Sequence, residues 1–148
     1  MTMTRRDMCF LLPAALLPST VSPKLFPADD TALPSATYPF DKLVARTSNH
    51  AEIRPVLTGK LATGESIEVH ETTLQPGAMP HAPHRHPHSE MWLIREGTVE
   101  LTINGESHRI GPGSVGFVHS NDEHGIKNVG GNPATYFVVA IGPSAGRT

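Results

Sequence analysis

Residues 98–110 read TVELTINGESHRI, and this stretch predicts the fold class. The apolar side chains of Val99, Leu101 and Ile103 alternate with polar ones, which is the pattern of a β-strand with one buried face. The Asn-Gly pair that follows favours the positive φ angles of a tight hairpin turn, so a second strand should return directly after it. We therefore expect an antiparallel hairpin whose three apolar side chains face the interior.

The rest of the chain beyond Asp41 is also punctuated into short apolar runs. Its 13 glycines and 14 prolines are scattered between these runs, which favours many turns and few helices. Only residues 38–45 indicate a helical turn. Further strands are expected around Ile67 and Val69 and over 54–57, 90–95, 114–118, 123–128 and 135–141. About eight short strands at this spacing predict an all-β, antiparallel barrel or sandwich.

Size and charge narrow the classes of function. The chain has 148 residues, enough for one domain with one hydrophobic core. The formal net charge is -2, and no long run of like charge occurs. A nucleic-acid partner is therefore not expected, because such proteins carry a basic footprint.

The N-terminus has the layout of an export signal. Arg5 and Arg6 precede the apolar stretch 8–17, which resembles a twin-arginine signal. This stretch is too short to span a membrane stably. We expect a signal segment over 1–30, an arm over 31–50 and a domain over 51–143, with an exported mature protein. The alternative is an amphipathic segment that packs on the domain of a cytoplasmic protein.

Histidine is the unusual feature of the composition, since four of nine histidines fall within residues 81–88. Histidine is the side chain most often used as a metal ligand. In an extended strand, residues two apart point to the same face, so His84, His86 and Glu90 would share one face. Trp92 continues that face into apolar sequence. The pattern predicts a chelating cluster at the polar end of a strand.

A second segment, 113–128, offers a fourth ligand, because His124 begins another alternating run. Together the two segments resemble the two motifs of the cupin superfamily. The first motif has a glycine, a His-x-His pair, a glutamate and a glycine, matched in order by Gly77, His84, His86, Glu90 and Gly97. The second is matched by Gly113, His124 and Asn128, while His119-Ser120-Asn121 replaces its Pro-x-Gly turn.

This resemblance covers about residues 66–141 and implies a jelly-roll-like cupin β-barrel. It implies that His84, His86, Glu90 and His124 hold one divalent metal ion per chain. Three imidazoles and one carboxylate without sulfur are compatible with Mn, Fe, Co, Ni, Cu or Zn. Mn or Fe is favoured, because a twin-arginine signal exports folded protein and so permits metal loading where the metal supply is controlled.

The remaining histidines are assigned by their position in these motifs. His81 and His88 are expected at the rim of the site. His119 is the candidate catalytic residue: it is either a base beside the metal ligands or an exposed turn residue. Trp92 is expected in the core rather than against a substrate. Surface positions are expected for His50, His70 and His108.

The expected function is that of a metal-dependent enzyme acting on a small organic molecule chelated through oxygen, of dioxygenase, isomerase or lyase type. The alternatives are a non-catalytic module that binds a small ligand or sugar, and metal storage, because fold alone does not define function. A homodimer is also expected, since edge strands of a small barrel tend to be paired or covered.

Overall fold

The computed structural model describes residues 32–48, 50–143 and 145–146. The expected signal segment 1–30 lies outside the described residues, and the division of the chain at residue 51 stays a prediction. No helix in the described part of the chain is long and apolar enough to cross a membrane.

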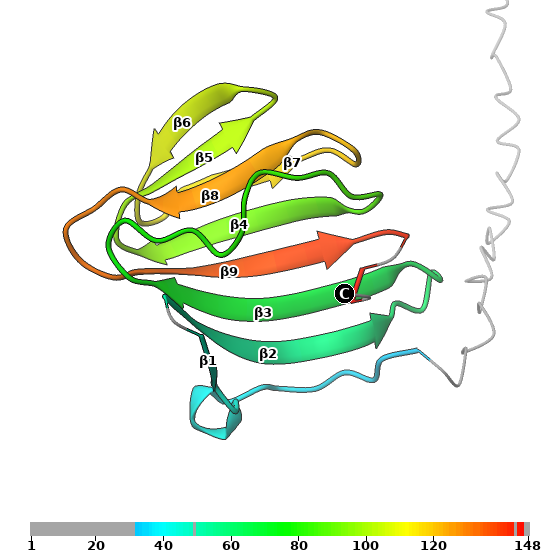
Figure 1. Ribbon diagram of the computed structural model, residues 1–148. Helices are drawn as coiled ribbons and strands as arrows, with labels where there is room; N and C mark the ends of the chain where they lie inside the picture. The colour runs from blue at the N-terminus through cyan, green and yellow to red at the C-terminus, as the bar shows by residue number, and fades with distance from the viewer. Residues whose placement is uncertain (1–31, 49, 144, 147–148) are drawn as a thin grey trace, which may run out of the picture.

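Two antiparallel sheets make up the domain (Figure 1). The larger sheet has, in spatial order, β1 (Arg46–Thr47), β2 (Ala51–Lys60), β3 (Ser66–Leu74), β9 (Ala134–Ile141), β4 (Ser89–Glu96) and β7 (Val115–Val118). The smaller sheet has β6 (Glu106–Ile110), β5 (Val99–Ile103) and β8 (His124–Asn128). The expected all-β, antiparallel, jelly-roll-like fold is confirmed, and the helical turn is the short 3-10 helix η1 (Phe40–Lys42).

The sheets do not close into the expected barrel. Between β3 and β4, residues 75–88 contain four prolines, at 76, 80, 83 and 87, which have no N–H to donate to a ladder. This segment makes a single antiparallel bridge to the smaller sheet, between His84 and His124. The proline-rich segment therefore connects the two sheets without completing a ladder between them.

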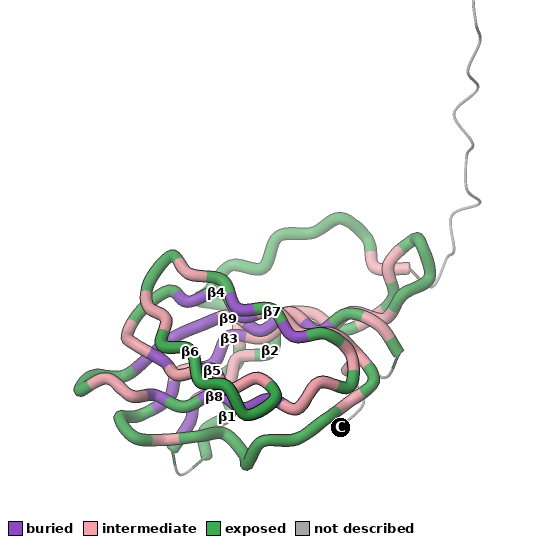
Figure 2. The backbone as a smooth tube through the Cα atoms, turned by 90° about the horizontal axis from the view of Figure 1, so that it is seen from above, coloured by how far each residue is buried: buried purple, intermediate pink, exposed green. Residues whose placement is uncertain are grey.

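The hairpin of β5 and β6 forms where the sequence predicts it. Asn104 and Gly105 have φ angles of 48° and 86°, as a tight turn requires. Val99 and Leu101 are buried, and Ile103 is partly buried against the same core. Buried residues concentrate within the strands, while most of the connecting loops are exposed (Figure 2).

A hydrophobic core fills the space between the sheets. It includes Trp92 and Ile94 of β4, as the alternation beyond Glu90 predicts, together with Leu74, Leu101, Val118, Ile126, Tyr136 and Val138. Gly97, the last glycine of the first motif, has φ +79°, and a Cβ there would lie 2.6 Å from the Cα of Ala134. This tight turn brings β5 across from β4 and so begins the second sheet.

The N-terminal arm packs on the outer side of the larger sheet. The ring of Phe40 lies 4.7 Å from the guanidinium of Arg54. It also lies 5.9 Å from that of Arg95, which in turn pairs with the buried Glu71 at 2.9 Å. The arm thus covers part of the outer side of this sheet, around Arg54 and Arg95, and leaves the opposite face of the sheet to the core.

Candidate metal centre

A cavity of about 420 Å³ lies between the two sheets, next to the hydrophobic core. This volume is in the range of small-molecule sites. Apolar side chains such as Trp92 and Val138 form part of its wall. The polar part of the wall includes Arg46, Glu68, His70, Thr72, His81, His84, His86, His88, Glu90 and His124.

The loop before β4 carries two of the four predicted ligands, His84 and His86, while Glu90 lies on β4 and His124 on β8. His84 and His124 exchange two backbone hydrogen bonds of 3.0 Å, which join this loop to the start of β8. The carbonyl of His86 accepts a 2.8 Å bond from the N–H of Asn121. The strand expected over 90–95 begins at Ser89, and His84 and His86 precede it in a segment with Pro83 and Pro87, where no regular pairing forms.

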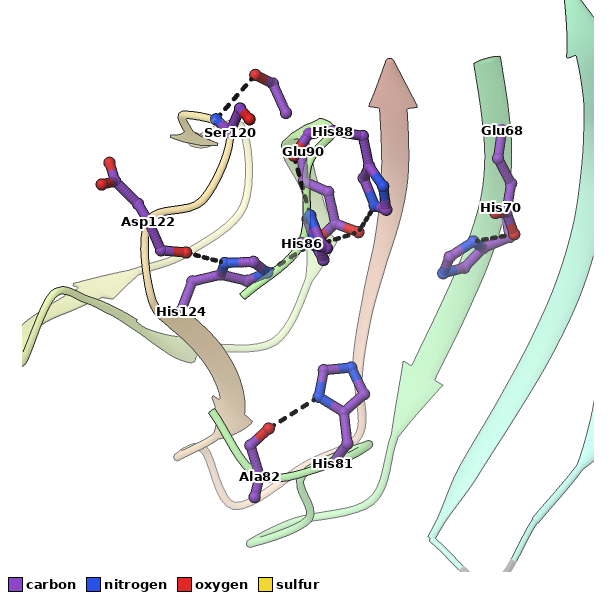
Figure 3. Close-up of polar contacts among 11 residues, drawn as sticks. Glu68, His70, His81, Ala82, His86, His88, Glu90, Ser120, Asp122 and His124 are labelled. Atoms are coloured by element: carbon purple, nitrogen blue, oxygen red, sulfur yellow. Dashed lines mark hydrogen bonds and ion pairs between the residues drawn. The ribbon is translucent and has the colours of Figure 1, made fainter. Parts of the chain in front are cut away.

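The four predicted ligands nevertheless come together. The Nε2 atom of His86 lies 3.3 Å from one carboxylate oxygen of Glu90, and the Nε2 atom of His124 lies 3.6 Å from the other. One ring nitrogen each from His84, His86 and His124 lie within 4.8 Å of one another. Figure 3 shows His86 and His124 pointing toward Glu90 from different elements.

The hydrogen bonds of His86 and His124 leave one ring nitrogen of each imidazole, Nε2, free. Nδ1 of His124 donates to the carbonyl of Asp122 at 2.9 Å, and Nδ1 of His86 donates to the carbonyl of His88 at 2.9 Å. Each Nε2 therefore keeps a lone pair in the neutral ring. Both Nε2 atoms are buried without a hydrogen-bond partner among the described residues. Orphaned, convergent nitrogens beside a carboxylate fit a divalent metal.

The electrostatics of the cluster depend on burial and on one carboxylate among several imidazoles. Burial lowers the pKa values of His84 and His86 below the usual range for histidine. Burial alone would raise the pKa of Glu90, but the nearby imidazole of His124, together with those of His86 and His88, leaves it lowered. For His124, burial is outweighed by Glu90 and Asp122, so its pKa is raised. Glu90 is thus held as a carboxylate, the form that binds metal.

His88 lies closer to the cluster than a rim position requires. Its ring stacks on that of His86, with centroids 3.6 Å apart, and its Nε2 lies 3.4 Å from Glu90. His86, His88 and Glu90 form a second group with metal-ligand spacing, distinct from His84, His86 and His124. His88 and His124 are therefore alternative histidine partners of His86 and Glu90 in a metal site.

The other candidates occupy different surroundings. His119 is exposed, its Nδ1 contacts the carbonyl of Ser120 at 2.9 Å, and it is not among the described residues that line the cavity. His81 lies at the cavity wall, with its ring edge-on to that of His84 at 4.2 Å. Trp92 is buried in the core as expected and also borders the cavity, 5.5 Å from His124 between ring centroids.

The prediction that His70 lies on the surface is wrong. It lines the cavity, and its Nδ1 lies 3.4 Å from Glu68 on the same strand. Glu68, His70 and Thr72 share the inward face of β3, while Val69 and Glu71 share the other face. Because both faces carry polar side chains, alternation marks two faces in the sequence but does not identify the one that lines the cavity.

The fold and the site define a small jelly-roll-like protein with a histidine-lined cavity between its sheets. Residues 70–140 match the family model described as Cupin domain. The structure is similar to that of KdgF from Halomonas sp., with a TM-score of 0.62 and 15% identity over 72% of this chain and 94% of the other. The chain carries a small domain of the cupin superfamily.

Two further similarities have been found. A predicted oxalate decarboxylase from Thermotoga maritima has a TM-score of 0.62 and 20% identity, over 73% of this chain and all of the other. In sequence, the chain is 34% identical over 62 residues to an L-ectoine synthase from Bordetella parapertussis, covering 41% of this chain and 47% of that enzyme. The chain thus spans about half the length of this curated relative.

Proposed function

We propose that the protein is a mononuclear metal-dependent cupin enzyme that acts on a small organic molecule bound through its oxygen atoms. The observation that carries this proposal is the pair of buried, unpartnered Nε2 atoms of His86 and His124, which converge on Glu90 inside the cavity. His84 completes the donor set. The reaction would be a dioxygenation, an isomerisation or a lyase reaction.

One divalent ion per chain, with Mn or Fe favoured, would supply a Lewis acid that orients the substrate and stabilises developing negative charge. The cavity wall would do the rest: Trp92 and Val138 exclude water, and Arg46 offers a guanidinium to an anionic group. Similar proteins named as a synthase and as a predicted decarboxylase support an enzyme over a non-catalytic module.

Metal content tests this proposal directly. We expect protein produced with and without residues 1–30 to contain about one divalent ion per chain by elemental analysis, because the donor set is complete within the domain. We also propose export, and Mn or Fe should predominate when the signal segment directs folding before transport. Protein that takes up no metal from either preparation, or on titration with Mn, Fe or Zn, would contradict the proposal.

We further propose a homodimer, built on the outer face of the larger sheet. Val115 and Phe117 of the edge strand β7 are 58% and 56% exposed, and Leu93 and Ile141 add exposed apolar surface on the same face. A contiguous apolar face of this kind typically marks an interface, and a second copy offers the same face by two-fold symmetry.

Analytical sedimentation tests this proposal by measuring the oligomeric state of the chain in solution. We expect the wild-type chain to sediment as a dimer at micromolar concentration and Phe117→Lys to sediment as a monomer, because the lysine places a charge in the apolar contact. Val44→Lys is the matched control, since Val44 is an exposed apolar residue on the arm, outside the larger sheet. A wild-type monomer, or an equal effect of both variants, would count against the interface.

A further inference from the structure

The cavity has a second cluster of ionisable groups besides the candidate metal ligands. Glu68 and His70 lie on β3, two residues apart on the same face, with 3.4 Å between the carboxylate and Nδ1. Figure 3 shows this pair on its own strand, with no contact drawn to His86, His88 or Glu90. The Glu68–His70 pair thus lines the same cavity but is separate from the candidate metal ligands.

The strand register fixes the relation between the two clusters. Glu68 pairs with Ala140 of β9, and Ala140 pairs with Glu90 of β4, so the three residues form one row across the sheet. Two strand spacings separate Glu68 from Glu90, roughly 10 Å. The residue between them is alanine, whose methyl group leaves room above the sheet. A small molecule bound at Glu90 would therefore have room to extend along this row toward Glu68 and His70.

The burial and the orientation of the pair suit a proton acceptor. His70 is half-buried, and burial lowers its pKa, so that the ring is neutral near pH 7. A neutral ring that donates Nδ1–H to Glu68 keeps the lone pair of Nε2 for the cavity. Glu68 then holds the ring in one tautomer and stabilises the cation formed when Nε2 takes a proton, as carboxylates do beside catalytic histidines.

We propose that His70 accepts and returns a proton of the substrate, with Glu68 as its positioning residue. The substrate class is small 2-oxo or 2-hydroxy acids with an acidic C–H, because Arg46 in the wall of the same cavity offers a guanidinium to a carboxylate. This inference rests on the proposed metal-dependent function and specifies it as enolisation. The C–H bond next to the carbonyl breaks, its proton moves to Nε2 of His70, and the electron pair stays on the substrate as an enolate. Nε2 then returns a proton to the same carbon, which restores both His70 and the substrate and, in D₂O, replaces C–H by C–D.

The test uses pyruvate as a probe of proton transfer. Zinc-loaded protein is incubated with pyruvate in D₂O, and exchange of the C3 protons is followed by ¹H NMR. We expect His70→Gln to lower the protein-catalysed exchange by about 100-fold or more, the usual contribution of general acid–base catalysis, with zinc content unchanged. Glu68→Gln should lower exchange less, by about tenfold, and His108→Gln on the exposed strand β6 is the matched control.

A second readout does not depend on turnover. In ¹⁵N-histidine spectra, we expect His70 to carry its proton on Nδ1 in the wild type and to lose this preference in Glu68→Gln. A proton on Nε2 in the wild type overturns the proposal. Exchange at equal rates in the wild type and in His70→Gln, at any level, also overturns it.

These measurements distinguish failure of the proton-acceptor role of His70 from failure of the proposed metal-dependent function. Normal zinc content with exchange that does not depend on His70 removes the proton acceptor and leaves the metal-dependent function standing. A wild-type protein that takes up no Mn, Fe or Zn removes the proposed function itself.

Discussion

Replacing His86 by alanine is expected to lower the affinity for a divalent metal by about 100-fold or more. Loss of a group that only supports a ligand costs about 10- to 100-fold, and loss of a ligand should cost at least as much. His86 belongs to both groups of residues with metal-ligand spacing, so no arrangement of the remaining histidines keeps the full donor set. Elemental analysis and metal titration would measure the change, and circular dichroism should show the fold retained.

His88→Ala is the discriminating comparison. Its ring stacks on His86 and contacts Glu90, so we expect an affinity loss of at most about tenfold, with stoichiometry near one ion per chain. His108→Ala, on the exposed strand β6, should change nothing. If His88→Ala loses its metal while His86→Ala keeps it, the ligands are assigned one step wrong along the chain, and His88 takes the place given to His86.

The four candidate ligands could be named from the sequence because period and motif spacing constrain them together. Alternation placed Glu90 on the same face as Trp92 and Ile94, and both of those residues are buried in the structure. The shared face of His84, His86 and Glu90 was inferred from extended geometry, but regular strand pairing begins only at Ser89, since proline removes the donors that a ladder needs. Convergence instead comes from tertiary contacts to Asn121 and His124, which local sequence patterns do not encode.

The wall of the cavity formed by Glu68 and His70 of β3 could not be predicted from alternation and motif spacing. Alternation identifies two faces of a strand, but it does not say which one is inward when one face is polar and lines a cavity. In β3, burial of Glu71 beside Arg95 also reverses the usual assumption that charges face solvent. The strand register places His70 in one row with Val138 and Trp92 across the sheet, and this long-range pairing is not encoded in the local sequence pattern.

Leu101→Ala is expected to lower the free energy of unfolding by about 2–5 kcal/mol, the usual cost of truncating a fully buried leucine. Leu101 is 2% exposed, and it reaches from β5 to the larger sheet, where a Cβ on Gly116 would lie 2.5 Å from its Cδ2 atom. The contact thus joins the two sheets, and its loss leaves a cavity in the core between them. This cost is a large part of the roughly 5–15 kcal/mol that holds a typical domain folded.

Urea denaturation in the presence of EDTA would measure the effect, because chelation removes any stabilisation by bound metal from the comparison. Val44→Ala is the matched control: this apolar side chain is 79% exposed, and its truncation should change the free energy of unfolding by less than about 0.5 kcal/mol. A cost below about 1 kcal/mol for Leu101→Ala would mean that the sheets are not packed against each other at this point. The walls of the cavity would then lack the fixed separation on which both the metal ligands and the Glu68–His70 pair depend.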